Sequence, residues 1–152
     1  MQDPAPENLR KPQIILAFDF GLRRIGVAAG DTITRTASPV TTIVVTSSQV
    51  AFENIDVLMK EWRPDLVVVG LPYNVDDSEG DMSAAARTFA AQLKDRYALT
   101  VELIDERYSS LDAERRLQAA RESGARRRRV AKSDIDAAAA CVILERWLTE
   151  RT

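Results

Sequence analysis

Residues 14–20 read IILAFDF, and the chain continues with GLRR at 21–24 and IGVAA at 25–29. The first stretch is a short apolar run bounded by Pro12 and Gly21, a pattern typical of a buried β-strand. Residues 21–24 have the composition of a turn, and residues 25–29 are apolar again. The two runs therefore predict a pair of neighbouring strands joined as a hairpin.

Three further segments predict strands in the rest of the chain. Residues 40–46 are rich in β-branched side chains, residues 66–69 (LVVV) are apolar throughout, and residues 99–104 form the last strand. Three strands that can pair as a meander, followed by βα units, indicate an α/β fold. We expect a mixed five-stranded sheet with helices on both faces.

Helical periodicity fills most of the intervening sequence. The predicted helices span residues 47–62, 82–97, 110–120 and 133–148. Residues 70–80 are rich in turn formers, and residues 122–129 are expected to be a mobile connection. The polar, proline-containing residues 1–13 are expected to form a flexible tail before one domain at 14–150.

Composition limits the possible chemistry. The chain has 152 residues, of which 45% are hydrophobic and 29% charged, and it contains no histidine and one cysteine, Cys141. This excludes Ser-His-Asp and Cys-His catalysis, histidine-containing zinc sites and internal disulfides. No segment approaches the roughly 18 apolar residues of a membrane span. We therefore expect a cytoplasmic protein without membrane association, in which carboxylates, hydroxyls, basic residues or a bound metal perform any catalysis.

The net charge of −2 conceals an uneven distribution. Residues 107–132 contain nine basic and three acidic residues, a local net charge of +6, whereas the remainder carries −8. A solvated helix face is the ordinary explanation for such a run. The consecutive arginines at 126–129 repel one another unless something neutralises them, which favours a polyanion as partner.

Acidic residues stand at three places where they require an explanation. Asp19 interrupts an apolar strand, and a buried carboxylate is costly unless it is paired, hydrogen-bonded or bound to a cation. Asp105 and Glu106 end the fifth strand, where only one of them can point toward Asp19 because side chains alternate along a strand. Asp136 lies at the start of the last helix. The alternatives are a turn cap at Asp19, solvent-exposed acids at 105–106, and a capping box in which Ser133 pairs with Asp136.

Three carboxylates that converge at one end of a sheet suit a hard divalent cation such as Mg²⁺. Such a cation binds phosphodiester oxygens and activates water, so phosphodiester hydrolysis needs no histidine. Alanines at 137–140 allow the last helix to pack closely on the sheet, which would bring Asp136 toward the strand ends.

Four blocks of this sequence resemble the YqgF family, also named RuvX, of Holliday-junction-resolvase-like or pre-16S rRNA nucleases. The blocks are D-F-G-L-R-R-I-G-V-A at 19–28, V-V-G-L-P at 68–72, D-E-R-Y-S-S at 105–110 with Ala113-Glu114, and I-D at 135–136 leading into Ala139-Ala140 and Ile143-Leu144. Together they cover about residues 14–148. The resemblance implies an RNase H-like fold and a metal-dependent endonuclease that matures the 5′ end of 16S rRNA.

The resemblance also implies roles for individual residues. Asp19, Glu106 and Asp136 are the implied catalytic residues and ligands of Mg²⁺ or Mn²⁺, and the implied phosphate ligands are Arg24, Arg107, Arg126, Arg127, Arg128 and Arg129. Related resolvases carry an acid on the fourth strand, where this chain has Gly70-Leu71-Pro72. The family usually has Asp-Gly after Gly-Leu-Pro, whereas this chain has Asp76-Asp77.

Three functions remain open at this point. The first is cleavage of structured RNA, with a ribosomal particle as a further partner. The second is resolution of branched DNA junctions, which requires a symmetric dimer for paired incisions. The third is a non-catalytic nucleic-acid-binding module for ribosome assembly. The sequence allows either a monomer or a homodimer.

Overall fold

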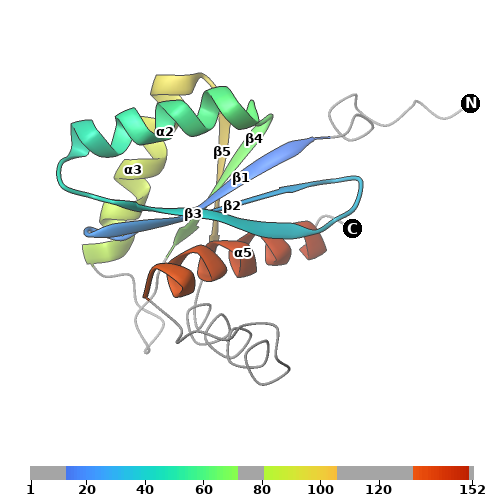
Figure 1. Ribbon diagram of the computed structural model, residues 1–152. Helices are drawn as coiled ribbons and strands as arrows, with labels where there is room; N and C mark the ends of the chain where they lie inside the picture. Colours follow the sequence, from blue (N-terminus) through green and yellow to red (C-terminus); the bar gives the residue numbers. More distant parts are fainter. Residues whose placement is uncertain (1–12, 72–80, 106–131, 151–152) are drawn as a thin grey trace, which may run out of the picture.

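The computed structural model describes residues 13–71, 81–105 and 132–150, and it builds them into one five-stranded sheet covered on both faces (Figure 1). The strands are β1 (Ile14–Asp19), β2 (Arg24–Asp31), β3 (Ala37–Val44), β4 (Leu66–Leu71) and β5 (Thr100–Asp105). The helices within these ranges are α2 (Ser48–Trp62), α3 (Asp81–Tyr97) and α5 (Lys132–Glu150). The predicted mixed sheet with helices on both faces is confirmed.

The sheet has the order β3-β2-β1-β4-β5, with β1 at its centre. β1 to β3 form the expected antiparallel meander, while β4 pairs parallel with β1 and β5 parallel with β4. Parallel strands end at the same edge of a sheet. The carboxyl ends of β1, β4 and β5 therefore share one edge, and β2 begins there.

Alternation along β1 divides the core into two layers. Leu16 and Phe18 pack against α2 and α3, whereas Ile15 and Ala17 pack against α5. All four side chains are completely buried. Because both faces are covered, the strand is apolar throughout until Asp19. Burying one large aliphatic or aromatic side chain of this kind contributes roughly 1.5–3 kcal/mol to folding.

Helix α2 begins and ends at the residues that its sequence signals predict. The hydroxyl of Ser47 accepts a hydrogen bond from the backbone N–H of Val50 at 3.1 Å, which caps the amino end. Arg63 adopts a left-handed conformation with φ of 45° at the carboxyl end, just before Pro64. The buried face carries Ile55 and other residues of the predicted apolar stripe.

One polar cluster joins α2 to α3. The Arg96 guanidinium donates two hydrogen bonds to the Asp56 carboxylate, from Nε at 2.9 Å and from Nη2 at 2.7 Å. The Tyr97 hydroxyl donates a third at 2.5 Å. These donors, Arg96 first, hold the pKa of the Asp56 carboxyl at about 2, below its ordinary value of 3.8. The phenol pKa of Tyr97 is raised, chiefly by burial and also by its bond to Asp56.

Helix α5 packs closely on β2 through small residues. Gly26, Ala28 and Gly30 lie on one face of β2, since they alternate along the strand. A Cβ atom at Gly26 would collide with the backbone carbonyl oxygen of Asp136, and one at Gly30 would meet the Thr36 carbonyl oxygen and the Leu144 side chain. Ala28 clusters with Ala140 and Cys141 of α5. This confirms the close packing expected from the alanine run.

Three strands are longer than the sequence predicts. β4 continues to Leu71 rather than ending at residue 69, so the loop predicted from residue 70 does not begin there. β3 begins at Ala37 rather than residue 40, although Pro39 lies within it. Proline cannot donate to a ladder, but β3 is an edge strand, and its pairing with β2 shifts register next to Pro39. β2 extends to Asp31 because Gly30 pairs with Ala37. Glycine often marks a turn, but Gly30 lies within β2 and allows α5 to approach the strand closely.

Other predictions lie outside the described residues: the tail at 1–13 except Gln13, the helix at 110–120, the connection at 122–129 and most of the loop at 70–80. Among the helices that the structure does describe, none combines the length and apolar character needed to cross a bilayer.

The contact between Gly26 and α5 predicts a large effect of one methyl group. We expect Gly26→Ala to lower the free energy of unfolding by about 3 kcal/mol, because the new Cβ would displace the Asp136 backbone. Ala28→Gly, which removes a methyl from the same face, is the control and should cost about 1 kcal/mol. Urea unfolding of both variants measures the difference. Equal losses would contradict the packing described.

The Asp56 cluster predicts a specific dependence of stability on pH. A carboxyl whose pKa is lowered by folding stabilises the protein above its unfolded pKa, and this contribution is lost as the pH falls through the folded pKa. The free energy of unfolding of Asp56→Asn should therefore lie below that of the wild type at neutral pH, and the difference should shrink between about pH 4 and pH 2.

Urea unfolding at several pH values tests this expectation. Asp95→Asn is the control, because Asp95 is an exposed carboxylate on the same helix, α3, and no described residue hydrogen-bonds to it. If the difference between Asp56→Asn and the wild type were the same at pH 2 and pH 7, the link between Asp56 ionisation and α2–α3 packing would be wrong.

Candidate active site

Asp19 ends the central strand at the edge where β4 and β5 also end. Its register partners are Gly26 on β2 and Gly70 on β4, so neither neighbouring strand places a side chain beside it. Residues two apart on a strand share a face, and Asp19 therefore lies on the α5 face together with Ala17 and Ile15. Asp19 itself is half-buried.

Asp136 lies in the part of α5 that crosses Gly26. Because Gly26 has no side chain, the Asp136 backbone rests directly on β2, beside the strand that carries Asp19. Arg24, two residues before Gly26 on the same face, donates a hydrogen bond from Nε to Asp136 Oδ2 at 2.6 Å. This ion pair engages the Asp136 carboxylate.

The two acids line one polar hollow of about 410 Å³. The other described residues of its wall are Phe20, Gly21, Leu22 and Arg23 in the turn between β1 and β2, and Arg24 at the start of β2. The turn is tight at Gly21, where a Cβ atom would stand 2.5 Å from the Arg24 carbonyl oxygen. Two acidic and two basic residues thus line one small space.

This set of side chains suits a divalent cation and a phosphate together. Carboxylate oxygens are the ligands that Mg²⁺ and Mn²⁺ prefer, and guanidinium groups bind phosphate oxygens. Asp19 and Asp136 are the two residues here that could hold such a cation. Within the described ranges no group of three or more metal-ligating side chains occurs.

The remaining residues predicted for the site lie outside the described residues. Glu106 follows directly after the end of β5, and Arg107 comes next in the chain. The arginine run at 126–129 and Asp76-Asp77 belong to the same undescribed segments. The structure therefore brings together Asp19, Arg24 and Asp136 of the predicted set.

Two features of the hollow were missed by sequence reasoning. Arg23, which the family resemblance left without a role, lines the hollow beside Arg24. Arg24 was expected to contact phosphate, but its Nε pairs with an acid 112 positions away in the chain. The alanines at 137–140 indicated that the last helix packs closely on the sheet, but nothing in the sequence indicated which side chains would meet.

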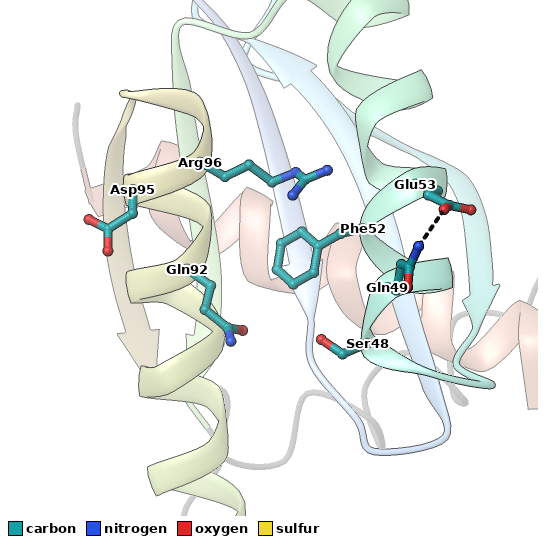
Figure 2. Close-up of a pocket in the computed structure, with 7 residues that line it drawn as sticks. All are labelled: Ser48, Gln49, Phe52, Glu53, Gln92, Asp95 and Arg96. Carbon is teal, nitrogen blue, oxygen red and sulfur yellow. Dashed lines mark hydrogen bonds between the residues drawn. The ribbon is translucent and has the colours of Figure 1, made fainter.

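A larger hollow of about 850 Å³ lies on the other face, between α2 and α3 (Figure 2). Figure 2 shows the Phe52 ring pointing from α2 toward α3, where Gln92 and Arg96 extend from the facing helix. The Arg96 guanidinium lies over the Phe52 ring at 5.3 Å from its centroid and is already paired with Asp56. Neither Asp19 nor Asp136 lines this larger hollow. We therefore place the candidate active site at the 410 Å³ hollow, which both acids line.

Comparisons with known proteins agree on one family. The RuvX family model, described as a Holliday junction resolvase, matches residues 13–150. A relative from Nitrosococcus oceani is 44% identical over 148 residues, covering 97% of this chain and 92% of the relative. One from Xanthomonas oryzae is 48% identical over 134 residues, covering 88% and 86%. Both carry the name "Putative pre-16S rRNA nuclease".

Solved structures show the same fold at low sequence identity. Thermus thermophilus RuvC in complex with a Holliday junction substrate aligns with a TM-score of 0.55 and 15% identity, covering 91% of this chain and 95% of RuvC. The fowlpox virus resolvase, also solved with Holliday junction DNA, aligns with a TM-score of 0.55 and 13% identity, covering 90% and 97%. The predicted RNase H-like fold is thereby confirmed.

Proposed function

This chain belongs to the RuvX family, and on that premise we propose that it is a metal-dependent endonuclease that hydrolyses phosphodiester bonds in structured RNA. We further propose that it matures the 5′ end of pre-16S rRNA as a single nuclease domain at residues 14–150. The name shared by the curated relatives supports this substrate. We propose a cytoplasmic location, with which the presence of a single cysteine, Cys141, agrees.

One observation carries the proposal: Asp19 and Asp136, from opposite ends of the chain, line the same small hollow. The packing of the core does not by itself require an acid at either position. A hydrophobic residue would suit the end of an apolar central strand equally well, and α5 packs through small residues rather than through Asp136. A pair of acids on the inner face of a sheet edge is typical of a cation site.

The proposed roles follow from the position of each residue. Asp19 and Asp136 hold Mg²⁺ or Mn²⁺, which when bound polarises the phosphodiester and activates water for attack. Arg24 and Arg23 lie on the wall of the hollow, where they attract and orient the phosphate. Glu106 follows β5, whose carboxyl end shares the sheet edge with β1, and we propose it as the third acid.

The basic segment is proposed to hold the nucleic acid outside the hollow. Arg107 and the four arginines at 126–129 add positive charge to a chain that is otherwise acidic. Contacts from arginine to the phosphate backbone give affinity without sequence specificity. The RNA structure and the position of the metal site would then determine where cleavage occurs.

Resolution of branched DNA is the second candidate function. The RuvX family model is described by this activity, and two structural neighbours were solved with Holliday junction DNA. Phosphate contacts alone discriminate weakly between RNA and DNA, although the 2′-hydroxyl offers a means of discrimination. A junction requires two paired incisions and therefore a symmetric dimer at cleavage concentrations.

Cleavage assays with acid variants test the metal site. We expect Asp19→Asn and Asp136→Asn each to reduce cleavage at least about 100-fold, because each removes a carboxylate that holds the cation. Both variants should remain folded and should still bind nucleic acid. The assay compares precursor 16S rRNA with a four-way DNA junction, each with and without Mn²⁺.

The outcomes separate the three functions. Preferential cleavage of the precursor rRNA supports maturation, and preferential cleavage of the junction by a dimer supports the resolvase. Asp95→Asn, which removes an exposed carboxylate on α3, should cleave as the wild type does. Full activity in Asp19→Asn would sink the metal-site assignment. No cleavage of either substrate by the wild type, with intact binding, would favour the non-catalytic module.

The arginine run predicts salt-sensitive affinity. We expect replacement of all four residues at 126–129 by alanine to weaken RNA binding and to reduce the slope of log affinity against log salt by up to about 3. The control is Lys60→Ala/Lys94→Ala, which removes two exposed positive charges from α2 and α3. Filter binding at several salt concentrations measures the slope, and an unchanged slope in the arginine variant would contradict this role.

A further inference from the structure

Arg24 and Asp136 form a contact that the proposed chemistry does not require. Arg24 Nε stands 2.6 Å from Asp136 Oδ2, a short distance for a charge-assisted hydrogen bond. The two side chains remain 36% and 23% exposed, so both can reach other partners in the hollow. Within the described residues, Nε is the one side-chain nitrogen of Arg24 that donates a hydrogen bond.

This contact conflicts with cation binding at the same carboxylate. A guanidinium that donates to Oδ2 neutralises the charge that would attract a cation, and it occupies one of the oxygens that would bind it. A divalent cation brought to Asp136 would also be repelled by the nearby guanidinium, since like charges at hydrogen-bonding distances interact strongly in a partly buried site. Arg24 and the cation therefore compete for Asp136.

A backbone phosphate of nucleic acid could replace the Asp136 carboxylate as the partner of Arg24, because both groups present anionic oxygens. Guanidinium binds phosphate oxygens with the geometry it uses for carboxylate oxygens, and Arg24 lines the hollow that Asp19 and Asp136 also line. A backbone phosphate entering the hollow would offer Arg24 a replacement for Asp136. The carboxylate would then be released without leaving either charge unpaired.

We propose that Arg24 exchanges partners: it holds Asp136 while the hollow lacks nucleic acid, and it moves to a backbone phosphate when nucleic acid binds, which frees Asp136 for the cation. This inference rests on the proposed function. Its consequence is that cation and nucleic acid bind cooperatively, each raising the affinity of the other by the same factor. Arg24 is in this account a positioning residue for Asp136 as well as a phosphate ligand.

The chain supplies a matched control for the test. Arg23 lines the same hollow and carries the same charge, but the hydrogen bond to Asp136 comes from Arg24. Mn²⁺ binding to the full chain is measured by calorimetry without nucleic acid for the wild type, Arg24→Gln and Arg23→Gln. We expect Arg24→Gln to bind Mn²⁺ about tenfold more tightly than the wild type, because a charge-assisted competitor is lost.

Arg23→Gln removes the same charge and should raise Mn²⁺ affinity by no more than about twofold, the size of a screened surface effect. Equal effects of the two substitutions would overturn the exchange, as would weaker Mn²⁺ binding by Arg24→Gln. Thermal melts establish that each variant is folded. If Arg24→Gln is not folded, Arg24→Met is used, which also removes the competing charge and donor and should likewise bind Mn²⁺ more tightly.

A second measurement tests the movement of Arg24 to phosphate. Binding of a precursor 16S rRNA fragment is measured in EDTA for the wild type, Arg24→Gln, Asp136→Asn and the double variant. We expect Asp136→Asn to bind the fragment more tightly than the wild type, because Arg24 is released. The double variant should gain nothing over Arg24→Gln. An equal gain in both backgrounds would overturn the exchange.

The two proposals can fail separately. If Asp19→Asn and Asp136→Asn bind Mn²⁺ as the wild type does, the proposed metal site is wrong. If both variants lose Mn²⁺ binding while Arg24→Gln and Arg23→Gln behave alike, the metal site stands and only the exchange of partners is wrong.

Discussion

The close approach of α5 to β2 at Gly26 is the contact on which the candidate site depends. Without a Cβ at Gly26, the Asp136 backbone rests directly on the strand. Gly26 is also the register partner of Asp19, and Arg24 lies two residues earlier on the same face. Because Gly26 has no side chain, the position of Asp136 on α5 is fixed relative to Asp19 on β1 and Arg24 on β2.

The apolar parts of the fold could be predicted because burial leaves a strong pattern. β1 and β4 are covered on both faces and appear as continuous apolar runs, and α2 carries both its stripe and its end signals. The ends of β2 and β3 could not be predicted. Gly30 and Pro39 ordinarily interrupt strands, but here Gly30 permits contact with α5 and Pro39 occupies an edge strand.

The sequence indicated the acidic residues of the candidate site better than it indicated the contacts of the arginines. Asp19 stands out because a carboxylate at the end of a buried strand needs a reason, and small residues in α5 indicated how Asp136 could approach. The pairing of Arg24 with Asp136 depends on tertiary register between distant segments, which composition and periodicity do not encode. The roles of Glu106, Arg107 and the arginines at 126–129 stay predictions, since these residues lie outside those described.

We propose that Asp19 and Asp136 together form a cation site. Anomalous diffraction from crystals soaked in Mn²⁺ tests it most directly, because the anomalous signal locates the cation independently of any activity. We expect an anomalous peak in the hollow, within about 2.1–2.2 Å of a carboxylate oxygen of Asp19 and of one of Asp136. A peak bound elsewhere, or by one of these carboxylates without the other, would contradict it.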